Sequence, residues 1–152
     1  MLPLVFELTS TAFTQGATVP ARHTCSGENV SPALAWTAPP EGTASLALVV
    51  DDPDAPGRVW QHWLAWNLPA TTRAIAEGGV GATMVQGTND FKSVGYGGPC
   101  PPPGHGAHRY FFRLYALDAV LGLPPGATRP ELDHAMKGHV LASTELMGKF
   151  WR

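Results

Sequence analysis

Charged residues are scarce in this 152-residue chain, because Asp, Glu, Lys and Arg make up 14% of it, against about a quarter in an average globular protein. The ten Lys and Arg are dispersed and the formal net charge is -2. The chain therefore lacks the basic stripe with which proteins neutralise a run of phosphates. It also lacks any apolar run near the roughly 20 residues that a membrane-spanning helix needs. The sequence predicts no nucleic-acid partner and no membrane span.

Cysteine is scarce too, since Cys25 and Cys100 are the only two and they form no CxxC pair. Residues 1–13 have no basic region, and Glu7 interrupts their apolar character. This pattern predicts no secretory signal and a cytoplasmic location. In a reducing compartment two free thiols are the default, and a disulfide between the two cysteines is the open alternative.

What the chain does contain indicates one folded domain, residues 1–152, with many turns: 44% hydrophobic residues, 17 Gly and 15 Pro. Apolar and aromatic runs at residues 45–50, 60–67 and 110–117 predict strands, and a shorter alternating run includes Phe6 and Leu8. Bulky residues on both faces of 110–117 predict a central strand that is covered on both sides. The predicted fold class is a mainly antiparallel β-sandwich.

One short helix is predicted near the C-terminus. Thr128 is suited to an N-cap, with Pro130 in the first turn and Glu131 at the third helical position. Apolar residues then recur at helical spacing as far as Gly138, which is suited to a stop. Residues 142–152 fit neither the helical nor the strand period.

Two segments carry polar residues suited to a site. DDPDAPG at residues 51–57 places three carboxylates within four residues, and these repel one another unless they are solvated or paired. A solvated acidic turn is the simpler interpretation. GGPCPPPGHGAHRY at residues 97–110 combines glycines, which let backbone N–H groups approach an anion, with prolines that stiffen the loop. His108 and Tyr110 share one strand face, whereas His62 lies alone in an apolar strand, where a hydrogen-bonded core histidine is the commoner finding.

Four of the chain's motifs, taken together, resemble the phosphatidylethanolamine-binding protein family, and specifically its bacterial branch of Raf-kinase-inhibitor-like proteins. The motifs are DPDAP at 52–56, His62 followed by Trp63, GGP at 97–99 and HRY at 108–110. The likeness extends over nearly the whole chain through HTCSG at 23–27, GTNDF at 87–91 and GHVLA at 138–142.

The resemblance implies a Greek-key type β-sandwich with a small pocket for phosphate, phosphoryl head groups or acetate-like anions. The ligand-binding residues that it implies are Asp52, His62, His108 and Tyr110, lined by Pro53, Trp60, Gly98 and Pro99. It further implies a cis peptide at Ala55–Pro56, a strand from Ala142 onward and a homodimer. No cofactor is expected.

The chemistry of these residue types supports an anion site. Two imidazoles facing an anion would each donate a hydrogen bond, more strongly when protonated. Asp52 would repel the anion directly, but behind one histidine it would fix the tautomer and favour the imidazolium. Tyr110 would add a neutral hydroxyl donor. The sequence predicts a binding protein with a regulatory or ligand-sensing role, whose affinity falls as the pH rises.

Other functions stay open. The same Asp, His and Tyr side chains could serve a metal-independent hydrolase, although no GxSxG nucleophile elbow is present and no enzymatic activity is expected. A metal held by two His and an Asp is disfavoured, because the sequence has no HxH or HExxH spacing. The third alternative is an inhibitor of, or scaffold for, another protein.

Overall fold

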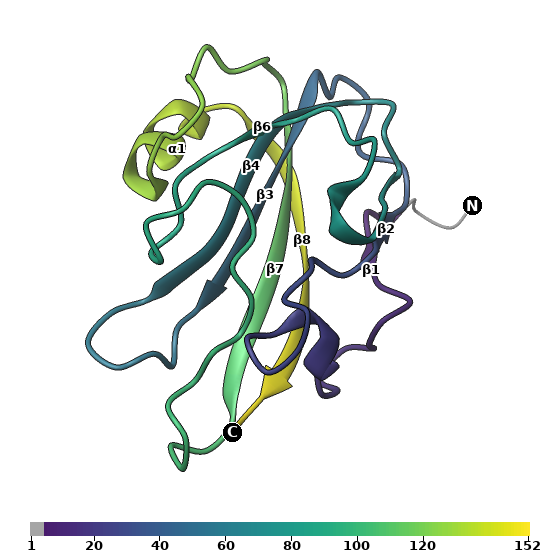
Figure 1. The fold of residues 1–152 in the computed structure, drawn as a ribbon. Coiled ribbons are helices and arrows are strands. Elements are labelled where there is room, and N and C mark those ends of the chain that lie inside the picture. The colour runs from purple at the N-terminus through teal and green to yellow at the C-terminus, as the bar shows by residue number, and fades with distance from the viewer. Residues whose placement is uncertain (1–4) are drawn as a thin grey trace.

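The computed structural model describes residues 5–152 and folds them into two antiparallel sheets and one α-helix (Figure 1). The larger sheet has the order β6-β4-β3-β7-β8: β3 (Ser45–Asp52), β4 (Trp60–Pro69), β6 (Val85–Gln86), β7 (His108–Leu117) and β8 (Val140–Phe150). The smaller sheet has the order β1-β2-β5: β1 (Leu8–Thr9), β2 (Leu34–Trp36) and β5 (Ala74–Ile75). The remaining elements are the 3-10 helices η1 (Ala21–His23) and η2 (Glu77–Gly79) and the helix α1 (Arg129–Met136). The predicted antiparallel β-sandwich is confirmed.

The main hydrophobic core lies between the two sheets. Leu8 of β1, Trp36 of β2 and Ile75 of β5 pack in one buried cluster with Leu48 of β3 and Phe112 of β7. Alternate residues of a strand share a face, so each strand of the large sheet presents one set of apolar side chains to this cluster. Burial of these side chains supplies the main stabilisation of the sandwich.

A second core covers the opposite face of the large sheet. Val49, Trp66 and Leu117 pack there against Leu132 and Met136 of α1. β7 lies between β3 and β8, and its two faces contribute to the two cores. The predicted central strand, covered on both sides, is confirmed.

The helix begins where the capping residues predict it. The Thr128 backbone N–H and hydroxyl donate to the Glu131 carboxylate at 3.1 and 2.9 Å, forming a capping box. The helix ends at Met136, and Gly138 follows with a φ of +82°. β8 then fills the segment that had no clear period. It is an edge strand whose first half is largely exposed, so apolar and polar residues need not alternate there.

Two further expectations concern the backbone. Within residues 5–152, no helix is both long enough and apolar enough to cross a membrane. The expected cis peptide at Ala55–Pro56 is wrong, because no cis peptide bond occurs in the described part of the chain. The chain turns here through an Asx-type turn, in which the Asp54 N–H donates to Asp52 Oδ1 at 2.8 Å, and through Gly57 with a φ of +81°.

Candidate functional site

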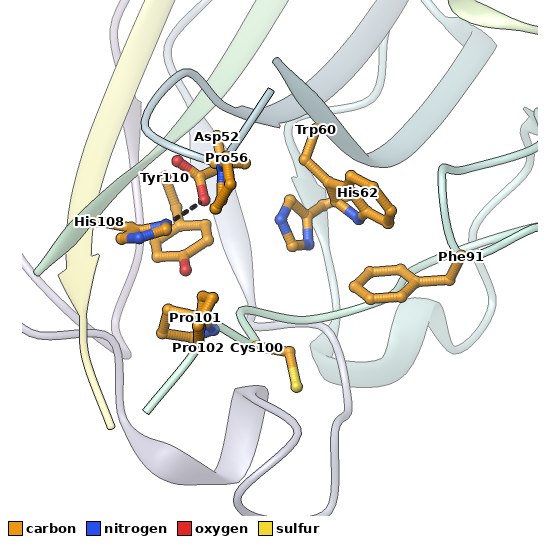
Figure 2. A pocket seen from close by; sticks show the side chains of 11 residues that line it. Asp52, Pro56, Trp60, His62, Phe91, Cys100, Pro101, Pro102, His108 and Tyr110 are labelled. Carbon is orange, nitrogen blue, oxygen red and sulfur yellow. Dashed lines mark hydrogen bonds and ion pairs between the residues drawn. The ribbon is translucent and has the colours of Figure 1, made fainter. Parts of the chain in front are cut away.

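A cavity of about 280 Å³ opens at one end of the large sheet (Figure 2). β3 ends at this end of the sheet, and β4 and β7 begin there, because each of them pairs with β3 in antiparallel orientation. The cavity is lined by Asp52, Ala55, Pro56, Trp60, His62, Phe91, Cys100, Pro101, Pro102, His108 and Tyr110. The fold therefore brings Asp52, His62, His108 and Tyr110 together from three distant segments, as the sequence analysis requires.

Three of the eight predicted binding residues do not line this cavity. Pro53 lines a separate groove on the sheet. Gly98 and Pro99 belong to the backbone that supports the cavity wall: the Gly98 N–H donates to Asn29 Oδ1 at 2.8 Å, and the Pro99 carbonyl accepts from the Cys25 N–H at 3.0 Å. Gly98 and Pro99 therefore hold the proline-rich loop against the segment that contains Cys25 and Asn29, and they do not line the cavity.

The lining residues that the sequence analysis missed are mostly apolar. Phe91 comes from the GTNDF motif, Pro101 and Pro102 from the proline-rich loop, and Ala55 and Pro56 from the DPDAP turn. Apolar side chains carry no chemical signal in a sequence, so their motifs were the only available indication. They give the cavity a mostly apolar lining around a small number of polar groups.

Asp52 and His108 form a buried pair. The His108 Nδ1–H donates to Asp52 Oδ2 at 2.7 Å, and each side chain is less than 5% exposed. The predicted pairing of Asp52 with a histidine is confirmed. The other ring nitrogen of His108, Nε2, lies 2.6 Å from Nδ1 of the exposed His105. Both nitrogens of His108 are thus engaged, and neither is free to donate to a ligand in this arrangement.

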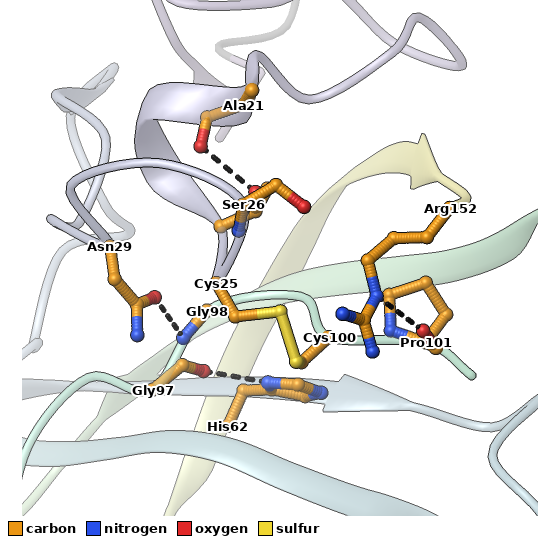
Figure 3. The surroundings of a disulfide bond; sticks show 11 residues. Ala21, Cys25, Ser26, Asn29, His62, Gly97, Gly98, Cys100, Pro101 and Arg152 are labelled. Atoms are coloured by element: carbon orange, nitrogen blue, oxygen red, sulfur yellow. Dashed lines mark hydrogen bonds between the residues drawn. A yellow bond between two sulfur atoms is a disulfide. The ribbon is translucent and has the colours of Figure 1, made fainter. Parts of the chain in front are cut away.

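His62 is held in one tautomer. Its Nδ1–H donates to the Gly97 carbonyl at 2.6 Å, so the neutral ring carries a lone pair on Nε2 (Figure 3). No residue of 5–152 forms a hydrogen bond with this Nε2. Burial lowers the pKa of His62, and the Gly97 hydrogen bond and the Asp52 charge offset this only in part. His62 is therefore neutral at pH 7 and offers an acceptor, which differs from the donor that the sequence analysis expected.

Two buried donors in the cavity lining have no partner among the described residues: the Tyr110 hydroxyl and the Trp60 indole N–H. The Tyr110 ring stands edge-on to His62, with the ring centroids 5.3 Å apart. Burial, with a further contribution from Asp52, raises the pKa of Tyr110, so its hydroxyl stays protonated. Unpaired buried polar groups are rare and need an explanation, which a bound ligand would supply.

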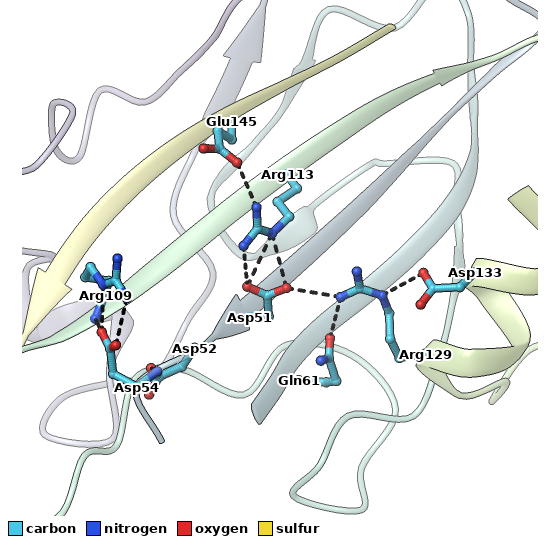
Figure 4. A network of polar contacts seen from close by, with 9 residues as sticks. All are labelled: Asp51, Asp52, Asp54, Gln61, Arg109, Arg113, Arg129, Asp133 and Glu145. Atoms are coloured by element: carbon cyan, nitrogen blue, oxygen red, sulfur yellow. Dashed lines mark hydrogen bonds and ion pairs between the residues drawn. The ribbon is translucent and has the colours of Figure 1, made fainter. Parts of the chain in front are cut away.

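The carboxylates of the DPDAP region are separated rather than solvated together. Asp51 and Asp52 are each 3% exposed and lie on opposite faces of the sheet (Figure 4), while Asp54 pairs with Arg109 at 2.9 Å. The simpler interpretation of a solvated acidic turn is therefore wrong. None of the residues lining the cavity is Lys or Arg. No three His, Cys, Asp or Glu side chains within residues 5–152 are grouped to hold a metal ion.

Cys25 and Cys100 form a disulfide, with their Cα atoms 5.3 Å apart, so the expectation of two free thiols is wrong (Figure 3). The proline-rich loop folds back against the segment after η1, where the Tyr96 hydroxyl donates to the His23 carbonyl at 2.5 Å. A Cβ on Gly98 would lie 2.2 Å from that carbonyl, so only glycine permits the approach. The Cys25–Cys100 disulfide fastens Cys100, a residue of the cavity wall, to a segment 75 residues away in the sequence.

Residues 9–151 match the model of the phosphatidylethanolamine-binding protein family. A UPF0098 protein from Methanothermobacter thermautotrophicus is 48% identical, over 96% of this chain and 99% of that protein. The crystal structure of a homologue of this family from Chlamydia trachomatis has a TM-score of 0.91 at 40% identity, covering 97% of each chain. Escherichia coli YbcL, described as a member of the mammalian family, has a TM-score of 0.90 at 33% identity, covering 97% of this chain and 98% of its own. The chain belongs to the phosphatidylethanolamine-binding protein family.

Proposed function

We propose that this protein binds a small anion, phosphate or a phosphoryl head group, in the cavity and acts as a regulator or ligand sensor without catalysing a reaction. The observation that carries the proposal is the Tyr110 hydroxyl, a neutral donor in the cavity lining that is buried without a partner. A phosphate oxygen would accept its hydrogen bond, and such bonds to charged groups are stronger than neutral ones.

The size and rigidity of the cavity support a ligand of this kind. A volume of about 280 Å³ lies at the lower end for small-molecule sites, which suits a head group better than a whole lipid. Pro101 and Pro102 stiffen one wall, and the Cys25–Cys100 bond fastens it. A preorganised wall reduces the entropy that is lost on binding.

The arrangement around His108 favours binding over turnover. In Ser- and Cys-dependent hydrolases, the histidine nitrogen opposite the carboxylate contacts the nucleophile. Here the Nε2 of His108 contacts His105 instead. Metal-independent hydrolysis and a scaffolding role remain predictions of the sequence.

Cytoplasmic location and a homodimer also remain predictions. The disulfide is the observation that speaks against the cytoplasm, because such bonds persist mainly in oxidising compartments.

Calorimetric titration with inorganic phosphate tests the proposal. The wild type should bind phosphate, with an affinity that falls between about pH 5 and pH 8 as the ligand passes from monoanion to dianion, because the cavity lining holds the Asp52 carboxylate and no Lys or Arg. Tyr110→Phe should weaken binding about tenfold, because it removes one hydrogen bond to a charged group. Tyr115→Phe is the matched control, since Tyr115 lines a different groove on the same strand. A wild type that fails to bind millimolar phosphate, or a loss that is equal in both variants, contradicts the proposal.

A further inference from the structure

We propose that the cavity selects an oxyanion that carries its own proton, such as a phosphomonoester monoanion, over an oxyanion that has none, such as a sulfate ester. This inference rests on the proposed function and names the ligand class of the same site. It follows from the kinds of hydrogen-bonding group that the cavity offers.

His62 presents a hydrogen-bond acceptor to the cavity. Its Nδ1–H is committed to the Gly97 carbonyl, so Nε2 can only accept a hydrogen bond while the ring is neutral. The ring is 2% exposed and occupies the middle of the cavity, between Asp52 and Phe91 in the view of Figure 2. An oxyanion without a proton would place its oxygen lone pairs against this lone pair. A P–O–H group would instead donate to it.

The Tyr110 hydroxyl and the Trp60 indole N–H need acceptors, and the unprotonated oxygens of the same ligand provide them. One acceptor and two donors thus match a tetrahedral oxyanion with one protonated oxygen and at least two bare ones. A ligand with only bare oxygens satisfies the donors but leaves His62 Nε2 unpaired.

The cavity lining holds the Asp52 carboxylate and no Lys or Arg. The charge of Asp54 raises the pKa of Tyr110, and the charge of Arg152 lowers it. The charge of Asp51 raises the pKa of His62 from the far face of β3. The Arg152 guanidinium is itself bound, its Nε–H donating to the Pro101 carbonyl at 2.7 Å. From β7, His108 faces the cavity with both ring nitrogens engaged. This environment favours a ligand of low negative charge.

The test compares methyl phosphate with methyl sulfate by calorimetry at pH 6. Near this pH a large fraction of a phosphomonoester is the monoanion, because its second pKa is about 6. Methyl sulfate has the same shape and the same single charge but no proton to donate. We expect methyl sulfate to bind at least tenfold more weakly, since it displaces water from His62 Nε2 without giving this acceptor a donor. We also expect the affinity for methyl phosphate to fall as the pH rises from 6 to 8 and the monoanion disappears.

The variant His62→Gln tests whether His62 is responsible for the preference for methyl phosphate over methyl sulfate. His62→Gln places an amide, which can turn its NH₂ group toward the ligand, where the imidazole acceptor lies. The preference for methyl phosphate should then shrink to less than threefold. Tyr115→Phe, which alters a separate groove, should keep the wild-type preference. If His62→Gln does not fold, the comparison of the two esters on the wild type remains a complete test.

The outcomes separate the two proposals. Binding of neither ester, together with no binding of inorganic phosphate, overturns the proposed function. Binding of both esters to the wild type within tenfold of each other overturns the proton selection and leaves the anion site standing. Methyl phosphate binding that strengthens toward pH 8 also overturns the selection.

Discussion

Asp51 and Asp52 are neighbours in sequence, and both are buried, yet they serve two different regions of the molecule (Figure 4). Asp51 lies in a charged cluster on the outer face of the large sheet, where it accepts from Arg113 and from Arg129, each at 3.1 Å. Asp52 lines the cavity, where it accepts a hydrogen bond from His108. Successive residues of a strand point to opposite faces, so one step along β3 separates the two environments.

The difference shows how the same side chain acquires two roles. Two guanidiniums compensate the charge of Asp51, and the cluster continues through Glu145 and Asp133, so each carboxylate of this cluster is paired with an arginine. Asp52 orients an imidazole beside two buried donors that have no partner within residues 5–152, and the proposed anion site rests on these donors. Ion pairs hold the charged cluster, and the Cys25–Cys100 disulfide fastens the wall of the cavity. Mutations can remove these two kinds of interaction separately.

The largest expected effect on stability comes from removing the disulfide that fastens the cavity wall. Replacing both Cys25 and Cys100 by Ser should lower the free energy of unfolding by about 4 kcal/mol, because the bond closes a loop between residues 75 apart and restricts the unfolded chain. Urea denaturation measures the change. The loss should be the same in 1 M NaCl, since it is not Coulombic. A loss below 1 kcal/mol would show that the cavity wall does not depend on the bond.

Asp51→Asn should have the next largest effect, lowering the free energy of unfolding by about 2 kcal/mol. It removes the shared carboxylate charge of two arginines whose side chains are only 28% and 21% exposed. Because part of the loss is Coulombic, 1 M NaCl should reduce it. Urea denaturation in low and high salt is the measurement, with Glu145→Gln at the exposed edge of the cluster as the control, expected to cost about 0.5 kcal/mol.

For phosphate binding, the substitution of Asp52 should have a larger effect than the substitution of Asp51. Asp51→Asn should change the phosphate affinity only slightly, through its distant charge on His62, whereas Asp52→Asn should change it several-fold, because Asp52 orients His108 and carries the charge in the cavity. A phosphate affinity that responds more to Asp51→Asn than to Asp52→Asn would remove the functional distinction between the two faces.

The smallest expected effect is a pH dependence of stability from His62. Burial lowers its pKa below the ordinary value of 6.5, so below about pH 6.5 the unfolded chain binds a proton before the folded one does. The stabilisation is present above this pH and is lost as the pH falls toward the folded pKa, by at most about 1.4 kcal/mol per pH unit. Urea denaturation from pH 5 to 7 should show a shallower slope for His62→Gln and an unchanged slope for His134→Gln, on the exposed side of α1.

Much of the fold could be predicted because its signals are local. The apolar run of β3, the aromatic run of β7 and the capping box at Thr128 each act within about ten residues. β8 gave no such signal, because it is an edge strand that is half exposed and shows no clean alternation. For this segment the family resemblance indicated a strand where the period could not.

The amino-acid sequence by itself determined which groups are available at the site: its motifs, through their resemblance to the family, predicted Asp52, His62, His108 and Tyr110 as site residues. Only the tertiary structure decided what each group offers. The Gly97 carbonyl commits one nitrogen of His62, His105 takes the free nitrogen of His108, and the folded loop pairs Cys25 with Cys100. The physical reason is that tautomers, orphan donors and disulfides depend on partners far away in the chain, and no local pattern records where those partners come to lie.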